Sequence, residues 1–246
     1  MLSRRAFALI PASLFSAQAR SGGTALWVSG EVPPFLRDGK NGAEGYAYEI
    51  FQAVLKQAGL QAELRFYPWA RALRMLEVQQ AQAALVIART ADREARFRWL
   101  FPVGNFRFVL VTRAADDRPV PADVAGLRKL RVGSMRASAS RSMLAEAGAS
   151  HVVEGKDYND LIALLRRGVV DAIIGPDSVM RSLDTAVGGG DLRMTLLNQN
   201  RAVYAAAAEA MPEENVARLR TAYQQLVDSG FVAQLRKRHP DAFFDD

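Results

Sequence analysis

The feature that most constrains this chain is a repeated alternation of short apolar runs with longer stretches of helical periodicity. In the first series, strand-like runs at 25–30, 61–68 and 83–88 alternate with segments at 46–60 and 69–80 whose apolar residues recur at helical spacing. The run AALVIA at 83–88 is apolar throughout, as a parallel strand buried on both faces should be. This strand–helix order predicts right-handed crossovers and a parallel sheet.

A second series of the same plan follows a linker rich in proline and aspartate at 116–127. It predicts strands at 130–135, 151–155 and 171–178, and helices at 138–149, 157–170 and 179–188. Outside both series we predict strands at 106–114, 192–197 and 201–208, helices at 212–230 and 231–240, and a loop at 31–45. The sequence therefore predicts two α/β lobes. Because open parallel sheets bind ligands at the carboxyl ends of their strands, we expect a cleft that closes on a small molecule.

Composition excludes several other classes of site. The 246 residues include no cysteine, so we expect neither a disulfide nor thiolate chemistry. His151 and His239 are far apart in the sequence, and no calcium-loop motif occurs, so we expect no metal and no cofactor. The alternative is a Ca²⁺ or Mg²⁺ site made of carboxylates alone. The formal charge of +6 is spread among interleaved acids, which argues against a nucleic-acid partner. No apolar run approaches the roughly 18 residues of a membrane helix, so we expect no membrane span.

The first nineteen residues have the three parts of an export signal. Arg4 and Arg5 form the positive end, an apolar stretch covers 6–15, and Ala17-Gln18-Ala19 is a small-x-small cleavage site. We therefore predict a signal peptide over 1–19, cleaved after Ala19, and a periplasmic protein. The segment SRRAF also resembles the twin-arginine export motif. The alternative is a short amphipathic N-terminal helix that stays attached.

Four arginines follow the all-apolar strand within ten residues. Arg89, Arg93 and Arg96 fall at helical spacing, which is typical of an exposed helix face paired with neighbouring acids. Alternatively, one arginine in the first turn after a buried strand receives an anion, since ligands bind there in such folds. We predict surface roles for Arg96 and Arg98 and the anion role for Arg93, with Arg89 as the substitute.

Six segments, taken in order, resemble one known family. They are PPF followed by GYAYEIFQAVLKQAGL, RTADRE, LFPVG, LRVGSMRASAS, LRRGVVDAIIGPDS and LRTAYQQLVDSGFVAQLRKRH. They are similar to the periplasmic solute-binding proteins of the polar amino-acid uptake type, extracellular solute-binding family 3. The resemblance implies an α/β fold of periplasmic binding protein type II, in which two parallel-rich sheets flanked by helices are joined by a two-strand hinge. We expect the first lobe to comprise 24–104 plus 203–246, and the second lobe 108–198.

The resemblance also implies a set of ligand contacts. An arginine at the T-x-x-R turn would form a bidentate pair with a carboxylate, and by position this is Arg93. Ser138 would add hydroxyl and N–H donors, and Asp177, or less favourably Glu31, would receive an ammonium group. The walls would be formed by aromatic residues, namely Trp69, Tyr67 and Phe35. Purely structural roles compete with these: a helix cap for Ser138 and Asp177, a core plug for Trp69, and a solvated position for Glu31.

Three positions depart from the family pattern. Val86 and Ala88 stand where amino-acid binders of this family often carry hydroxyl residues, and Val32 stands where an aromatic residue usually stacks on the ligand. These departures put a strict α-amino-acid ligand in doubt. A different carboxylate, or a cationic metabolite, is then the alternative ligand.

The resemblance implies a non-enzymatic binding protein that captures a small, polar, amino-acid-like carboxylate by hinge closure. Its partner would be the inner-membrane permease of an ABC importer, and we expect a monomer. Two other functions stay open. One is a periplasmic carbon–oxygen lyase similar to cyclohexadienyl dehydratase, marked by a carboxylate or histidine with a shifted pKa near the arginine. The other is an orphan ligand-sensing module that reports to a separate membrane receptor.

Overall fold

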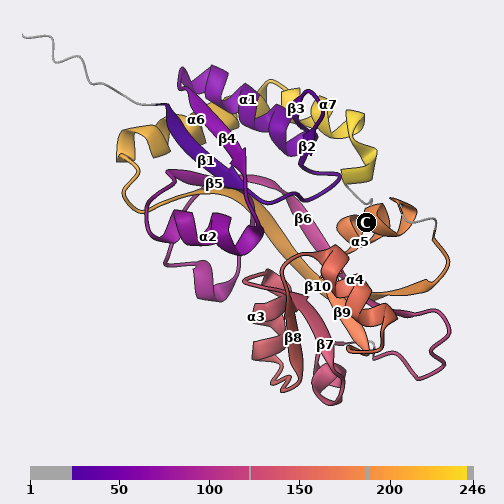
Figure 1. Ribbon diagram of the computed structural model, residues 1–246. Coiled ribbons are helices and arrows are strands. Elements are labelled where there is room, and N and C mark those ends of the chain that lie inside the picture. The colour runs from indigo at the N-terminus through magenta and orange to yellow at the C-terminus, as the bar shows by residue number, and fades with distance from the viewer. Residues whose placement is uncertain (1–23, 122, 187–188, 243–246) are drawn as a thin grey trace, which may run out of the picture.

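One eight-stranded sheet runs through the whole molecule in the order β4-β1-β5-β10-β6-β9-β7-β8 (Figure 1). The computed structural model describes residues 24–121, 123–186 and 189–242, so the predicted signal peptide lies outside the described residues. Two long antiparallel strands, β6 (Arg98–Arg113) and β10 (Leu192–Ala207), occupy the centre of the sheet and extend into both halves. The predicted α/β fold with two lobes and a two-strand hinge is confirmed, while the residue boundaries given for the lobes stay a prediction.

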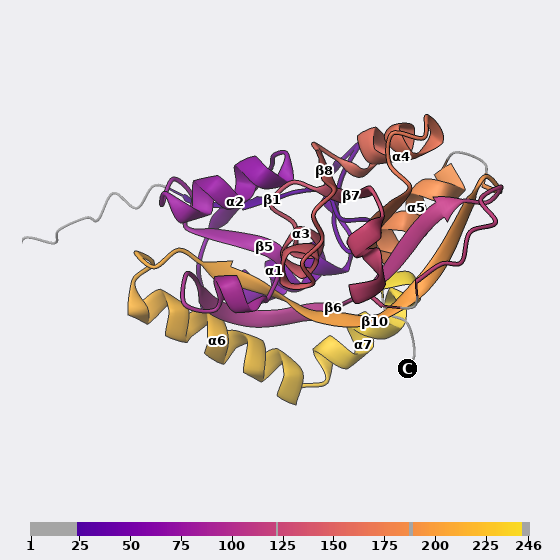
Figure 2. The same cartoon turned by 90° about the horizontal axis from the view of Figure 1, so that it is seen from below.

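The first lobe places three parallel strands beside the central pair. These strands are β1 (Ala25–Ser29), β4 (Ala62–Phe66) and β5 (Ala83–Ala88). Its helices are α1 (Tyr46–Ala58), α2 (Trp69–Glu77), α6 (Glu213–Asp228) and α7 (Phe231–Arg238). Helices α1, α6 and α7 cover one face of the sheet, and α2 lies on the other face (Figures 1 and 2). A short turn of 3-10 helix, η1 (Ala91–Arg93), follows β5 directly.

The second lobe repeats the plan with β7 (Val132–Met135), β8 (Val152–Gly155) and β9 (Ala172–Pro176), which pair in parallel. Its helices are α3 (Ala139–Glu146), α4 (Tyr158–Arg166) and α5 (Asp177–Ala186), with a 3-10 turn, η2 (Ala125–Lys129), before β7. Side-chain caps fix where two of these helices begin. Ser138 caps α3 by accepting from the Arg141 N–H, and Asp157 caps α4 by accepting from the Asp160 N–H.

Two parts of the fold differ from the sequence predictions. Strand β6 begins eight residues before the predicted start at Phe106, and β10 is continuous across the polar residues 198–200 that separated two predicted strands. The predicted loop at 31–45 contains a short hairpin of β2 (Arg37–Gly39) and β3 (Gly42–Glu44). Residues 198–200 and the residues of the hairpin do not favour strands, so backbone pairing with an adjacent strand forms these segments.

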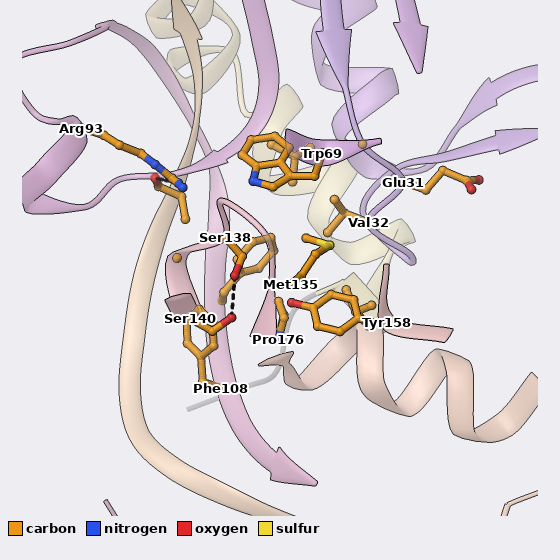
Figure 3. A pocket seen from close by; sticks show the side chains of 16 residues that line it. Glu31, Val32, Trp69, Arg93, Phe108, Met135, Ser138, Ser140, Tyr158 and Pro176 are labelled. Atoms are coloured by element: carbon orange, nitrogen blue, oxygen red, sulfur yellow. Dashed lines mark hydrogen bonds between the residues drawn. The ribbon is translucent and has the colours of Figure 1, made fainter. Parts of the chain in front are cut away.

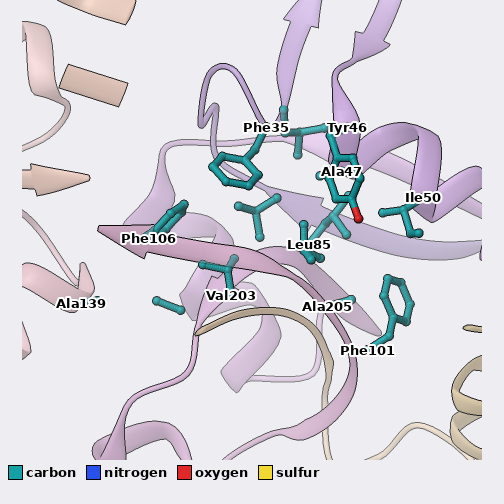
Figure 4. Packing of buried hydrophobic residues seen from close by; sticks show 14 of the residues in the cluster. Phe35, Tyr46, Ala47, Ile50, Leu85, Phe101, Phe106, Ala139, Val203 and Ala205 are labelled. Carbon is teal, nitrogen blue, oxygen red and sulfur yellow. The ribbon is translucent and has the colours of Figure 1, made fainter. Parts of the chain in front are cut away.

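The largest core cluster lies where the central strands meet α1 (Figure 4). Leu85 of β5, Val203 of β10 and Phe101 of β6 pack under Ile50 of α1, and each is exposed by at most 1%. Helix α1 buries one face because its apolar residues recur at helical spacing, and it ends at Gly59 in the left-handed conformation at φ 61°. Val86 and Ala88 at the carboxyl end of β5 pack in this core, and that end positions the site described next.

Candidate functional site

A cavity opens between the lobes at the carboxyl end of β5 and the amino end of α3 (Figure 3). Its unfilled space, including the part that is open to solvent, is about 490 Å³. Its lining is Gly30, Glu31, Val32, Trp69, Val86, Ala88, Arg93, Phe106, Phe108, Met135, Ser138, Ala139, Ser140, Tyr158, Pro176 and Val179. A wider outer cavity of about 820 Å³ shares Gly30, Glu31, Trp69 and Met135 with it and adds polar residues such as Lys156 and Asp157.

Arg93 is the cationic side chain of the inner cavity. Its backbone N–H donates to the Thr90 carbonyl, which closes the η1 turn and directs the side chain inward from the end of β5. The residue is 2% exposed. Nη1 donates to the Ala88 carbonyl at 3.0 Å and Nη2 to the Ala137 carbonyl at 2.7 Å, whereas Nε is buried without a hydrogen-bond partner. Burial lowers the pKa of the guanidinium, and the nearby charges of Asp92 and Glu77 oppose this shift only in part.

The other three arginines of this segment are paired with acids outside the cavity. Arg89 forms a bidentate pair with Glu94 and lies over the rings of Trp99 and Tyr204. Arg96 pairs with Glu77, and Arg98 with Glu213. Among the described residues, no ion pair includes Arg93. Of the four arginines, three therefore form ion pairs with acids and one, Arg93, is buried without an ion pair. Arg89 does not line the cavity.

Serine hydroxyls form the opposite wall. Ser138 Oγ lies 2.9 Å from Ser140 Oγ and 3.3 Å from Ser134 Oγ, and it also accepts from the Arg141 N–H at the start of α3. Ser138 thus caps a helix and lines the cavity at once. Tyr158 lies beside these hydroxyls in Figure 3, and burial raises the pKa of its phenol, opposed by a hydrogen bond with Ser140.

Two hydrogen bonds cross the cleft and converge on one backbone atom. The carbonyl oxygen of Ala137, in the turn before α3, accepts from Arg93 Nη2 at 2.7 Å and from the Trp69 indole N–H at 2.8 Å. Ala137 adopts a left-handed conformation at φ 57°, and Val86 in the cavity wall does so at φ 61°. Such angles are uncommon for alanine and rare for a β-branched residue. Strained backbone of this kind gathers at binding sites.

The structure brings some of the predicted ligand contacts together and separates others. Arg93, Ser138, Trp69 and Glu31 line the inner cavity. Tyr67 lines the outer cavity, beneath the Arg71 guanidinium. Phe35 is 1% exposed and packs edge-on against Phe106, so it supports the wall from behind.

Asp177 is not part of either cavity lining. Its carboxylate is fully buried, accepts from Arg107 Nη2 at 3.0 Å and from Arg181 Nε at 2.6 Å, and is therefore already neutralised. The structure does not place it to receive an ammonium group.

Several lining residues were missed in the sequence. Phe106 and Phe108 alternate along β6 and so share one face of the strand, a pattern that could have marked them. Tyr158 is the first residue of α4, directly after the Asp157 cap, and it is buried. The Ala137 carbonyl has no sequence signal, because it acts through the backbone.

Two further features are absent from the described residues. There, no cluster of three or more histidine, cysteine, aspartate or glutamate side chains is arranged to hold a metal ion. Within the same residues, no helix has both the length and the apolar character needed to cross a membrane.

Solved structures share this fold. A histidine kinase sensor domain with similarity to periplasmic binding proteins superposes with a TM-score of 0.79 at 20% identity, covering 88% of this chain and 95% of that one. ArtJ, the arginine-, lysine-, histidine-binding protein of Geobacillus stearothermophilus, gives 0.77 at 17% identity, with 88% and 95% covered. The GluR0 ligand-binding core of Nostoc punctiforme, in complex with (L)-glutamate, gives 0.72 at 18% identity, with 88% and 99% covered.

Sequence comparison identifies the family. No curated protein sequence matches the chain significantly. The family model of the bacterial extracellular solute-binding proteins, family 3, matches residues 26–240, which is most of the chain. The chain therefore belongs to the bacterial extracellular solute-binding proteins of family 3.

Proposed function

We propose that this protein captures a small carboxylate-bearing solute in its interlobe cleft, with Arg93 as the anchor. The observation that carries the proposal is the guanidinium itself. It is 2% exposed, no ion pair within the described residues includes it, and its Nε–H has no hydrogen-bond partner. A buried charge without an ion-pair partner is costly to the fold, and a ligand carboxylate would supply that partner.

The chemistry of the site fits a carboxylate. A guanidinium presents five N–H donors in a planar fork, and two of them are held by the Ala88 and Ala137 carbonyls. The remaining donors suit a bidentate carboxylate, and the low exposure strengthens such a pair. The hydroxyls of Ser138 and Ser140 lie across the cavity and would donate to the same anion.

Capture would proceed by closure of the lobes about β6 and β10. Ligand contacts from both lobes favour the closed form, so binding shifts the population toward it. We propose that the captured solute passes to an ABC importer in the inner membrane, after export of the protein to the periplasm. Family membership supports this partner.

The test is a thermal-shift screen of the full-length chain against amino acids, other small carboxylates and polyamines. A ligand at 100 times its dissociation constant should add about 2.7 kcal/mol of stability. The stabilisation by a carboxylate should disappear in Arg93→Ala and persist in Arg96→Ala, a matched loss of an exposed arginine. A carboxylate that stabilises both variants equally would refute Arg93 as the anchor. Chemical consumption of the recovered ligand would refute the binding role in favour of an enzyme.

A further inference from the structure

We infer that the solute is a monocarboxylate with a compact apolar body and no ammonium group. This inference rests on the proposed function, since it takes Arg93 as the anchor of the carboxylate. It narrows the ligand from amino-acid-like solutes in general to their counterparts without the amine. Three observations on the inner cavity carry it: the sequestered acid of α5, the direction of Glu31, and the apolar character of the remaining wall.

The first observation concerns Asp177. In an α-amino acid the ammonium group is bonded to the carbon beside the carboxylate, so a carboxylate on Arg93 places the ammonium inside the inner cavity. Asp177 is fully buried, and its two carboxylate oxygens accept from Arg107 and Arg181. It lines neither the inner nor the outer cavity. Its negative charge is therefore already matched by two cations.

The second observation concerns Glu31, the acidic residue among those that line the inner cavity. Its Oε1 accepts from the Asp38 backbone N–H at 3.1 Å. In Figure 3 its carboxylate points away from the space between Arg93 and Tyr158. Asp38 and Asp157 line the outer cavity, and Asp157 is held as the cap of α4 by the Asp160 N–H. Among the described residues that line the inner cavity, no carboxylate therefore faces the position of an α-ammonium.

The third observation is the wall itself. The side chains of Trp69, Val86, Phe106, Phe108, Met135 and Val179 line the cavity that Arg93 also lines. An ammonium group in that space would lose its hydration without gaining a countercharge, which is strongly unfavourable. A branched or aromatic hydrocarbon body would instead bury apolar surface against the same side chains, which is favourable. The cavity therefore favours a carboxylate without an ammonium group over the corresponding amino acid.

The test compares ligands that differ by the amine alone. Isothermal titration calorimetry of the full-length chain would measure leucine against 4-methylpentanoate, and phenylalanine against 3-phenylpropanoate. We expect each ammonium-free acid to bind at least about tenfold more tightly than its amino acid, a difference of about 1.4 kcal/mol. The neutral 3-phenylpropanamide should bind at least about tenfold more weakly than 3-phenylpropanoate, because it lacks the anion. Arg93→Ala should remove the affinity for both acids.

The outcomes separate this inference from the proposed function. If an amino acid, or 6-aminohexanoate with its distal amine, binds as tightly as the ammonium-free acids and requires Arg93, the inference is overturned while carboxylate capture stands. If no carboxylate in either series or in the wider screen binds the wild-type chain, carboxylate capture fails and the inference fails with it. Tight, Arg93-dependent binding confined to the ammonium-free acids supports both.

Discussion

At the scale of single residues, Arg93 differs from the other three arginines of its segment because no ion pair among the described residues includes it. The three other arginines of its segment each face a carboxylate, while Arg93 donates to two backbone carbonyls and keeps Nε without a hydrogen-bond partner. Lysine at this position would retain the positive charge but has a single donor centre, which cannot hold two carbonyls and a bidentate carboxylate together. Binding at this site therefore depends on the planar, forked shape of the guanidinium as well as on its charge.

This reasoning predicts that Arg93→Lys lowers affinity for a bound carboxylate by about tenfold to a hundredfold, since one charge-assisted hydrogen bond contributes about 1.5–3 kcal/mol. Isothermal titration calorimetry would measure the change, and circular dichroism would check that the fold is kept. Arg96→Lys is the matched control, because Arg96 pairs with Glu77 outside the cavity. Equal affinity in the wild type and Arg93→Lys would show that charge alone suffices.

Asp177 is predicted to stabilise the fold without contacting the ligand. Its buried carboxylate joins Arg107 of β6 to Arg181 of α5, and both arginines retain some exposure to water. Asp177→Asn should lower the free energy of unfolding by about 1–3 kcal/mol, measured by chemical denaturation. Affinity for an ammonium-free carboxylate should change by less than about threefold. Unchanged stability with a selective loss of affinity for amino acids would instead place Asp177 on the ligand.

How far the sequence predicts the site depends on how each residue acts. Arg93 could be singled out because it follows an all-apolar strand, and Ser138 because it precedes a predicted helix. Asp177 has the same local signature, yet a partner 70 residues away on β6 decides the direction of its carboxylate. Phe35 is aromatic beside a proline pair, but it packs behind the wall rather than in it. Long-range pairing of this kind leaves no trace in the local pattern.

At the scale of elements, the turn that joins β7 to α3 brings the two lobes together. Its Ala137 carbonyl accepts from both Arg93 and Trp69, and the residue holds a left-handed conformation at φ 57°. That conformation costs an alanine about 1–2 kcal/mol and a glycine little. The turn therefore presents the carbonyl at the expense of local strain.

We predict that Ala137→Gly raises the free energy of unfolding by about 0.5–1 kcal/mol, because glycine relieves the strain and leaves the carbonyl in place. Ala145→Gly, at an exposed position inside α3, is the control and should lower it by about 0.5–1 kcal/mol. Urea denaturation measures both. A loss of stability in both variants would mean that the turn is not strained.

A second element-scale prediction concerns acid. Asp171 bonds Arg131 and Arg118, and Asp116 bonds Arg118 and Arg113, so together they tie the linker after β6 to β7 and β9. The arginines lower the pKa of Asp171 and lower that of Asp116 to about 2, both from 3.8. A carboxyl with a lowered folded-state pKa stabilises the fold fully above its unfolded value. That stabilisation is lost as the pH falls from 3.8 through the folded value.

Stability should therefore fall between about pH 5 and pH 2, and less steeply in Asp171→Asn than in the wild type. Chemical denaturation at a series of pH values measures the slope. Glu209→Gln, which removes an exposed carboxylate, should keep the wild-type slope. Identical slopes for the wild type and Asp171→Asn would contradict the role of this cluster.

Elements with a strong periodic pattern were predicted well, and elements formed by pairing were not. The runs that became β5 and β9 are apolar throughout, so their burial could be read directly. The joining of 192–197 to 201–208 in β10 depends on the β6 ladder, in which register shifts accommodate the polar residues 198–200. The β2–β3 hairpin likewise depends on pairing between residues that do not favour strands.

At the scale of the whole molecule, the two lobes are connected in two different ways. The first connection is covalent, because β6 and β10 run from one lobe into the other. The register of the β10–β6 ladder shifts between Leu196 and Asn200, close to the place where these strands pass between the lobes. Across the cleft, the Ala137 carbonyl forms two hydrogen bonds with the first lobe. The register shift between β10 and β6 interrupts their ladder locally, and an interrupted ladder bends more readily than a regular one. The crossing strands can therefore serve as the hinge while the cleft bonds hold the closed form.

Without a ligand, the closed form buries the Arg93 charge beside an apolar wall, with no ion-pair partner among the described residues, and opening the cleft would rehydrate it. A carboxylate reverses this preference, because it supplies the countercharge in the closed form alone. We therefore predict that small-angle X-ray scattering gives a larger radius of gyration for the ligand-free chain than for the chain saturated with a carboxylate. The saturated value should approach that of a compact chain of this length, about 17–18 Å. Arg93→Ala should keep the same radius with and without the carboxylate, because it removes both the buried charge and its anion. A wild-type radius that stays constant through saturation would show that capture does not require hinge closure.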